Sequence, residues 1–303
     1  MNPLKELEGF DAPHQLALIK KLGGKVVKDA ILRGEKTVTV EDAIRALFDK
    51  NGRRIPEGLQ APVRDANRSF GLRQPDFSWA NLHNRIALLH NSLGRRHNTG
   101  IKAEELKAEA ERLLAIIKED IQIANIANGV CLPVILPKLF MDDLGAELEL
   151  YLDGVKNSYT KIFGNRIFYN YCKGILMNKI GIIKESRHDQ LISRMKEGPV
   201  IGLHFPNSLQ GFSAYADHEQ MLMLPEGFIL SGMDTVIAII MYPDILVCDC
   251  NVPMLNISAL QWRYPFSSLL QFKTVDHKLI FNNFPYLPIS DGYSSAGLLF
   301  IVN

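Results

Sequence analysis

A change in charged-residue content and in the spacing of apolar residues along the chain constrains its fold more than any other feature. Residues 1–120 carry 21 Lys and Arg against 17 Asp and Glu, whereas residues 199–303 hold only three basic and eight acidic residues. The early part spaces its apolar residues at helical intervals, and the later part has short apolar runs separated by turn residues. The sequence therefore predicts an α+β fold. We expect an N-terminal helical region with a helix hairpin, then a C-terminal mixed domain with a largely antiparallel sheet.

The bulk properties indicate a folded, reduced, cytoplasmic protein. Of 303 residues, 47% are hydrophobic and 22% charged, which is ordinary for a globular chain with a substantial core. Four cysteines without a CxxC spacing form no disulfide framework. The N-terminus lacks the apolar core of a secretory signal. The long apolar run over 228–247 is broken by Asp234 and Pro243, so we expect a buried helix and strand and no membrane segment.

Three parts are predicted along the chain. Residues 1–76 form a short-helix region with a Pro/Gly-rich linker, 77–129 an antiparallel helix hairpin, and 130–303 the α+β domain. The shorter helices are expected over 12–23, 25–33 and 39–51, and the hairpin helices over 78–96 and 102–125. In the last part, helices are expected over 142–162, 186–196 and 235–241, and strands over 130–136, 167–171, 175–183, 200–205, 267–273, 278–282 and 297–302.

The dipeptide His-Asn recurs at 83–84, 90–91 and 97–98, a strict period of seven. On one helix this step returns to nearly the same face, with histidines about 10.5 Å apart along the axis. That spacing is too wide for one metal ion, whose ligands lie about 2 Å away. The stripe, with Arg95 and Arg96 nearby, is a candidate contact for a partner helix or a phosphate backbone. The more ordinary interpretation is a set of flanking positions in a helix hairpin.

Residues 50–100 are the most basic stretch, with nine basic residues against three acidic ones. Arginine suits bidentate phosphate contacts. A nucleic-acid interface also needs a groove-entering helix or exposed aromatic residues, and the aromatics here fit local packing equally well. The sequence therefore favours a solvated face or internal ion pairs over nucleic-acid contact.

The C-terminal part contains a scattered polar set. Cys248 and Cys250 share one side of an extended strand and, with two histidines, could bind zinc. A cysteine nucleophile with a distant histidine base is a second possibility. Neither arrangement has its usual sequence neighbours, and cysteines in apolar strands are mostly small buried hydrophobes. The catalytic candidates are His204, Asp217, His218 and Cys248, and the only metal candidates are Cys248 and Cys250.

A strand followed by a polar loop is predicted over residues 198–212. Loops of this composition at strand ends often line ligand pockets. The binding candidates are His83, His90, Arg95, Arg96 and His97 in the helical region, and Asn207, Ser208 and Gln210 in this loop.

Two functions follow as hypotheses. The first is a non-enzymatic binding or assembly protein, with a protein partner or self-association through the helical region. The second is a small-molecule-binding or hydrolytic enzyme with its site in the C-terminal domain. The sequence favours the first, because every enzyme constellation lacks its expected neighbours, and it predicts no cofactor.

Overall fold

The computed structural model describes residues 12–36, 45–64, 71–75, 81–247, 251–263, 268–285 and 292–302. The chain divides into two compact units, Met1–Ile44 and Arg45–Asn303. Residues 77–129 and 130–303 both fall in the second unit. Their predicted status as separate domains stays a prediction.

The described part of the first unit is a pair of short helices. These are α1 (Ala12–Lys21) and α2 (Lys25–Leu32), close to the helices expected from the sequence. Gly23 and Gly24 join them at φ values of 97° and 83°, a region that glycine enters without steric cost. The helix expected over 39–51 is not formed at 45–51, and residues 37–44 lie outside the described residues.

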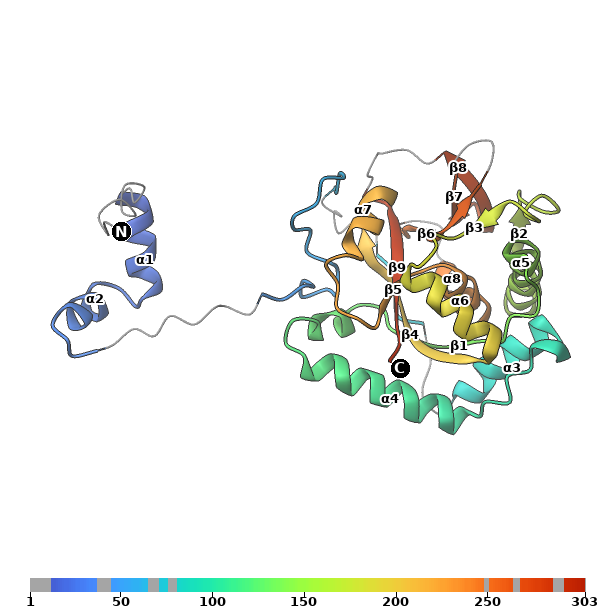
Figure 1. Cartoon of the computed structure of the whole chain (residues 1–303), viewed down its shortest axis with the longest axis horizontal. Coiled ribbons are helices and arrows are strands. Elements are labelled where there is room, and N and C mark those ends of the chain that lie inside the picture. The colour runs from blue at the N-terminus through green and yellow to red at the C-terminus, as the bar shows by residue number, and fades with distance from the viewer. Residues whose placement is uncertain are drawn as a thin grey trace. The chain divides into compact units, whose positions relative to one another are not determined.

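A mixed sheet forms the centre of the second unit (Figure 1). Its strands are β1 (Leu132–Leu136), β2 (Ile167–Asn170), β3 (Ile180–Gly181), β4 (Val200–Gln210), β5 (Phe228–Leu230), β6 (Met254–Trp262), β7 (Ser268–Val275), β8 (Lys278–Pro285) and β9 (Ser294–Phe300). The order is β1-β4-β9-β6-β7-β8-β2, with β3 beside β6 and β5 beside β9. The pairs β2–β8 and β6–β9 are parallel, and the other pairs are antiparallel.

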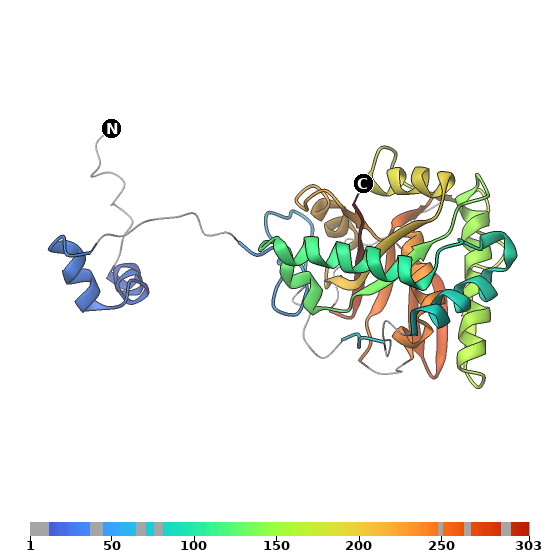
Figure 2. The ribbon, with the colours of Figure 1, turned by 90° about the horizontal axis from the view of Figure 1, so that it is seen from below.

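Helices surround this sheet (Figures 1 and 2). They are α3 (Leu82–Leu93), α4 (Ala103–Glu119), α5 (Leu144–Ile162), α6 (Arg187–Glu197), α7 (Ala214–Gln220) and α8 (Met233–Met241), with 3-10 turns η3 (Arg95–His97), η4 (Ala124–Asn128) and η5 (Pro243–Leu246). Side-chain oxygens of Asp143, Ser186 and Ser213 accept backbone N–H groups at the starts of α5, α6 and α7. Such caps satisfy donors that the first helical turn leaves unpaired.

The core lies on both faces of the sheet. Along β9, Leu298 and Phe300 belong to a hydrophobic cluster that includes residues of α4, whereas Leu299 belongs to a second cluster with residues of α5 and α8. Successive strand side chains point to opposite faces, so the two clusters lie on opposite sides of the sheet. Every residue of α8 is buried, so the apolar run over 228–247 contributes to the hydrophobic core. None of the helices in the described ranges combines the length and apolarity needed to cross a bilayer.

The α+β class is confirmed, but the expectation that the last three strands pair antiparallel in chain order is wrong in part. The hairpin of β7 and β8 forms, with Asp276 and His277 at positive φ in its turn. By contrast, β9 inserts between β4 and β6 and runs parallel to β6. All seven residues of β9 are buried. A strand covered on both faces belongs in the middle of a sheet, and apolar character alone does not identify its neighbours.

The helix hairpin also differs from the expectation. Its first helix, α3, ends at Leu93 and not at Arg96, because Gly94 takes φ 84° and ψ 175°. The two helices also pack chiefly away from each other. Helix α3 contacts α5 and α8, and α4 contacts β4 and β1. The pair therefore contributes to the core of the second unit.

Candidate functional site

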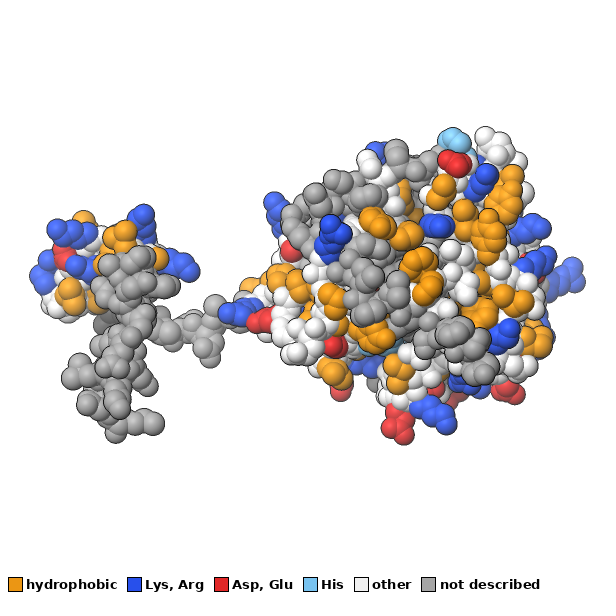
Figure 3. Space-filling view, turned by 90° about the horizontal axis from the view of Figure 1, so that it is seen from above, with side chains coloured by type: hydrophobic (Ala, Val, Ile, Leu, Met, Phe, Trp, Pro, Cys, Tyr) orange, Lys and Arg blue, Asp and Glu red, His pale blue; other side chains and the backbone are white. Residues whose placement is uncertain are grey.

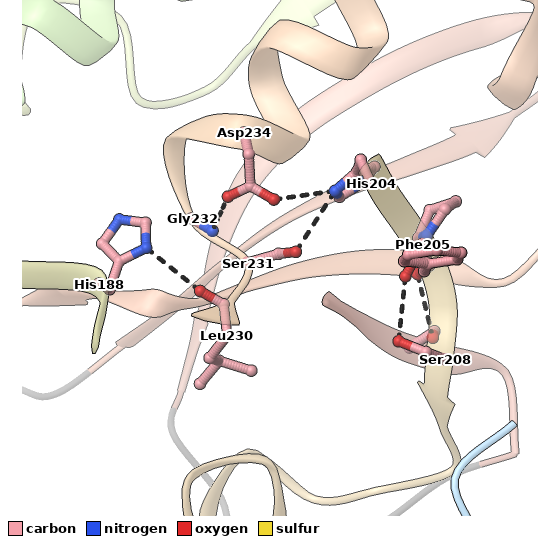
Figure 4. Close-up of polar contacts among 10 residues, drawn as sticks. His188, His204, Phe205, Ser208, Leu230, Ser231, Gly232 and Asp234 are labelled. Carbon is pink, nitrogen blue, oxygen red and sulfur yellow. Dashed lines mark hydrogen bonds and ion pairs between the residues drawn. The ribbon is translucent and has the colours of Figure 1, made fainter. Parts of the chain in front are cut away.

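His188 lies in the first turn of α6, held by the local fold. Ser186 caps this helix, and the His188 ring is buried against β5. Its Nδ1 lies 3.2 Å from the carbonyl oxygen of Leu230, so Nδ1 carries the hydrogen and donates it (Figure 4). A Cβ at Gly232 would lie 2.3 Å from the His188 Cε1 atom. Only glycine at residue 232 lets the imidazole approach this closely.

His218 is the second imidazole of this region, on the short helix α7. The ring bonds to the backbone of Ser258 in β6. As in His188, the Nε2 atom is buried and has no hydrogen-bond partner among the described residues. Both histidines thus have one ring nitrogen fixed by the backbone and one nitrogen unsatisfied.

A pocket of about 640 Å³ contains both histidines. Its surface is mostly apolar and includes Ile183, Met221, Leu222, Leu230 and Ala259. The further polar residues of the lining are Lys184, Glu185, Ser186, Arg187 and Glu219. Pockets of this size and composition, with a few placed polar groups, are typical of small-molecule sites.

Two charged residues of the pocket wall are engaged in holding the fold. The Glu219 Oε2 atom accepts the backbone N–H groups of Gln60 and Ala61, at 2.9 and 3.1 Å. The Arg187 guanidinium donates to three backbone carbonyls, those of Leu224, Pro225 and Phe228. These contacts fix the wall of the pocket and engage Arg187 and one carboxylate oxygen of Glu219 within the fold.

Burial lowers the pKa of His188 and of His218 below the ordinary value of 6.5. Both rings are therefore neutral at pH 7. With Nδ1 protonated in His188, its Nε2 is a hydrogen-bond acceptor. A neutral imidazole nitrogen can also bind a metal ion. However, no group of three or more His, Cys, Asp and Glu side chains in the described ranges is arranged to hold one.

The predicted catalytic residue His204 lies elsewhere, in a fully buried network on β4 (Figure 4). Its Nδ1 is 2.8 Å from Asp234 Oδ2 and 3.4 Å from the Ser231 hydroxyl. The other Asp234 oxygen accepts the N–H of Gly232 at 2.6 Å. Burial acts against ionisation of Asp234, but the His204 hydrogen bond and charge outweigh it and lower the pKa.

This network has the residue types of a catalytic triad without its geometry. In a triad the acid and the nucleophile bond to different nitrogens of the histidine. Here Asp234 and Ser231 both face Nδ1 of His204, and its Nε2 has no partner among the described residues. The histidine is therefore not placed to take the Ser231 proton while Asp234 orients it. The network ties β4 to the start of α8.

Asp217 is also buried but lies apart from His204. Its carboxyl accepts a 2.6 Å hydrogen bond from the Ser258 hydroxyl. Burial raises the pKa of Asp217 well above its ordinary value, although the Ser258 bond opposes this. Asp217 thus lies on the buried side of α7, where its environment favours the protonated acid. Cys248 and Cys250 lie outside the described residues.

The polar loop expected after residue 205 is part of β4, so that expectation is wrong. An irregularity between Phe205 and Leu209 lets the strand continue to Gln210. Ser208 donates to the Phe205 carbonyl, and Gln210 to the Gly292 carbonyl. Asn207 lines a separate, smaller hollow of about 360 Å³. These side chains are not gathered in the His188–His218 pocket.

The His-Asn stripe does not form a continuous helix face. His83 is exposed on α3, and His90 is partly buried beside the Thr99 hydroxyl at 3.0 Å. His97 lies beyond the end of α3 and is buried, with its Nε2 2.9 Å from Glu147. Arg95 and Arg96 are exposed, and the Arg96 guanidinium lies over the Phe140 ring.

Sequence reasoning identified His218 but missed His188, which has no distinctive spacing. The sequence predicts a helix from residue 186, and the Ser186 cap of that helix places His188 two residues later. Asp234 stands out in the sequence only as a charge within the apolar run over 228–247. Comparison of the chain with protein-family models, with curated proteins and with solved structures finds no match.

Proposed function

We propose that this protein binds a small, largely apolar molecule carrying a hydroxyl or amine, in the His188–His218 pocket. This is the small-molecule hypothesis for the C-terminal domain, without a hydrolytic step. The observation that carries it is that His188 and His218 line one mostly apolar pocket, each with a buried Nε2 atom that has no hydrogen-bond partner among the described residues. A buried polar group without a partner costs about 1–3 kcal/mol, which a donor on the ligand would recover.

The partner-binding hypothesis has less support. It relied on the three histidines sharing one helix face, and His90 and His97 are engaged inside the fold. The hydrolytic alternative also has less support, because the Ser231, His204 and Asp234 geometry is not that of an activated nucleophile.

Two probes of nearly equal shape test the proposal. 2-Naphthol carries one hydroxyl donor, whereas naphthalene carries none, and both fluoresce. We expect the protein to bind 2-naphthol at least about fivefold more tightly, the equivalent of about 1 kcal/mol. His218→Leu should abolish this preference while naphthalene binding persists. His83→Leu, at an exposed residue of α3, is the matched control and should leave the preference unchanged.

Two results would contradict the proposal. One is equal affinity of the wild-type protein for the two probes. The other concerns Met221→Trp, a substitution that places a large ring in the pocket. If this variant unfolds at the wild-type temperature and still binds both probes, the proposal is contradicted.

A further inference from the structure

One face of the sheet carries exposed or partly exposed apolar and basic side chains where β2, β8 and β7 lie side by side. The register pairs Ile167 with Lys278, and both Tyr169 and Lys273 with Ile280. Paired residues point to the same side of a sheet. The opposite side of these strands is buried in the core through Phe168, Phe272, Leu279 and Phe281. We call the outer side the tyrosine face, made of Ile167, Tyr169, Tyr171, Lys273, Lys278 and Ile280.

Two aromatic rings are exposed on the tyrosine face. Tyr169 is 40% exposed and Tyr171 is 66% exposed. Their ring centroids are 6.4 Å apart and the ring planes differ by only 18°. The Lys278 ammonium lies 6.0 Å from the Tyr169 centroid. Exposed parallel rings beside a cation are the surface on which unpaired nucleic-acid bases stack.

The segments that form β2, β7 and β8, together with the loop that follows β2, are strongly basic in sequence. Residues 163–184 and 268–285 together contain six basic residues and one acidic residue, Asp276. In the whole of 199–303 there are only three basic residues, and two of them, Lys273 and Lys278, lie on the tyrosine face. Figure 3 views the unit from the side of Figure 1 on which β7 and β8 are labelled, and hydrophobic and basic side chains are interspersed there. Such a surface is complementary to a polyanion.

We propose that the tyrosine face docks a single-stranded nucleic acid, with bases on Tyr169 and Tyr171 and phosphates near Lys273 and Lys278. Bases in a duplex are already stacked and paired, so only a single strand can present them to these rings. A purely apolar protein surface fits less well, because covering the two lysines would require opposing charge. This proposal does not depend on the pocket.

Fluorescence anisotropy of the full chain with a labelled oligothymidylate of about 12 nucleotides tests it. We expect binding that weakens about tenfold for each of Tyr169→Ala and Tyr171→Ala. Tyr169→Phe should retain the wild-type affinity because it keeps the ring. Tyr215→Ala, at a tyrosine 47% exposed on α7, is the matched control and should have no effect. Lys273→Gln and Lys278→Gln should each reduce the slope of log affinity against log salt by about 0.7.

Several outcomes overturn the proposal. The first is no binding of the oligothymidylate at about 50 mM salt, where phosphate contacts are strong. The second is unchanged affinity in the Tyr169→Ala/Tyr171→Ala double variant. The third is equal affinity for a duplex of the same length. A wild-type dimer in light scattering that the double variant loses would assign the face to a second copy of the chain instead.

Discussion

The stability of the Asp217→Asn variant relative to the wild type should increase as the pH rises. Asp217 is fully buried, and its described contact is one hydrogen bond from the Ser258 hydroxyl. Burial raises the pKa of this carboxyl well above the ordinary value of 3.8. The folded protein therefore holds a proton that the unfolded chain releases. Asparagine keeps the shape and the neutral charge but has no proton to lose.

The magnitude follows from proton linkage. Above the unfolded pKa of about 3.9, the native state binds one proton more than the unfolded state at this residue. The stability of the wild type then falls by up to about 1.4 kcal/mol per pH unit, until the pH passes the folded pKa. The Asp217→Asn variant has no such proton to lose, so its stability relative to the wild type should rise with pH at up to this slope.

Urea unfolding at pH 5, 6 and 7 measures the effect, with the fluorescence of Trp262 in β6 as a reporter near Ser258. Ser258→Ala is the control, because it removes the hydrogen bond but leaves the titrating carboxyl. It should lose about 1 kcal/mol and keep the wild-type dependence on pH. A stability difference between Asp217→Asn and wild type that stays constant over this range would refute the reasoning, since it would mean that Asp217 is ionised in the native state.

Three further predictions concern stability and binding. His97→Ala removes the imidazole that lies 2.9 Å from the buried Glu147 carboxyl. We expect the free energy of unfolding in urea to fall by about 3–5 kcal/mol. A fall of less than about 1 kcal/mol would contradict a stabilising buried pair. Gly145→Ala would place a Cβ 2.0 Å from the Leu176 carbonyl oxygen, so we expect a loss of about 3 kcal/mol, against about 0.5 kcal/mol or less for Gly164→Ala in the same assay. Affinity for 2-naphthol should be level from pH 8 to 7 and fall only below about pH 6.5, as the two lowered-pKa pocket histidines become protonated and lose their acceptor nitrogens. A titration that shows the loss between pH 8 and 7 would contradict neutral, buried imidazoles.

Much of the fold was predictable because local signals agree with the tertiary structure. Helices α5 and α6 and the strands β7 and β8 all lie close to where the sequence predicts them. These elements depend on caps, periodicity and turn residues, which act over a few positions. The place of β9 could not be predicted in this way, because its pairing with β4, β5 and β6 joins residues far apart in sequence.

The candidate pocket was less predictable than the fold. His218 was recognised as polar in an apolar region, but nothing in the sequence linked it to His188. Their proximity depends on α6 packing on β5 and α7 packing on β6. The three His-Asn pairs do not share one helix face, because Gly94 ends α3 before the third pair at residues 97–98.

The most direct test of the pocket proposal is nitrogen NMR of the His188 and His218 side chains at pH 7, with 2-naphthol and then with naphthalene. We predict that both Nε2 atoms are unprotonated in the free protein. At least one should shift with 2-naphthol, and neither should shift comparably with naphthalene. Protonated Nε2 atoms, or identical responses to the two probes, would contradict the proposal that these imidazoles recognise a ligand donor.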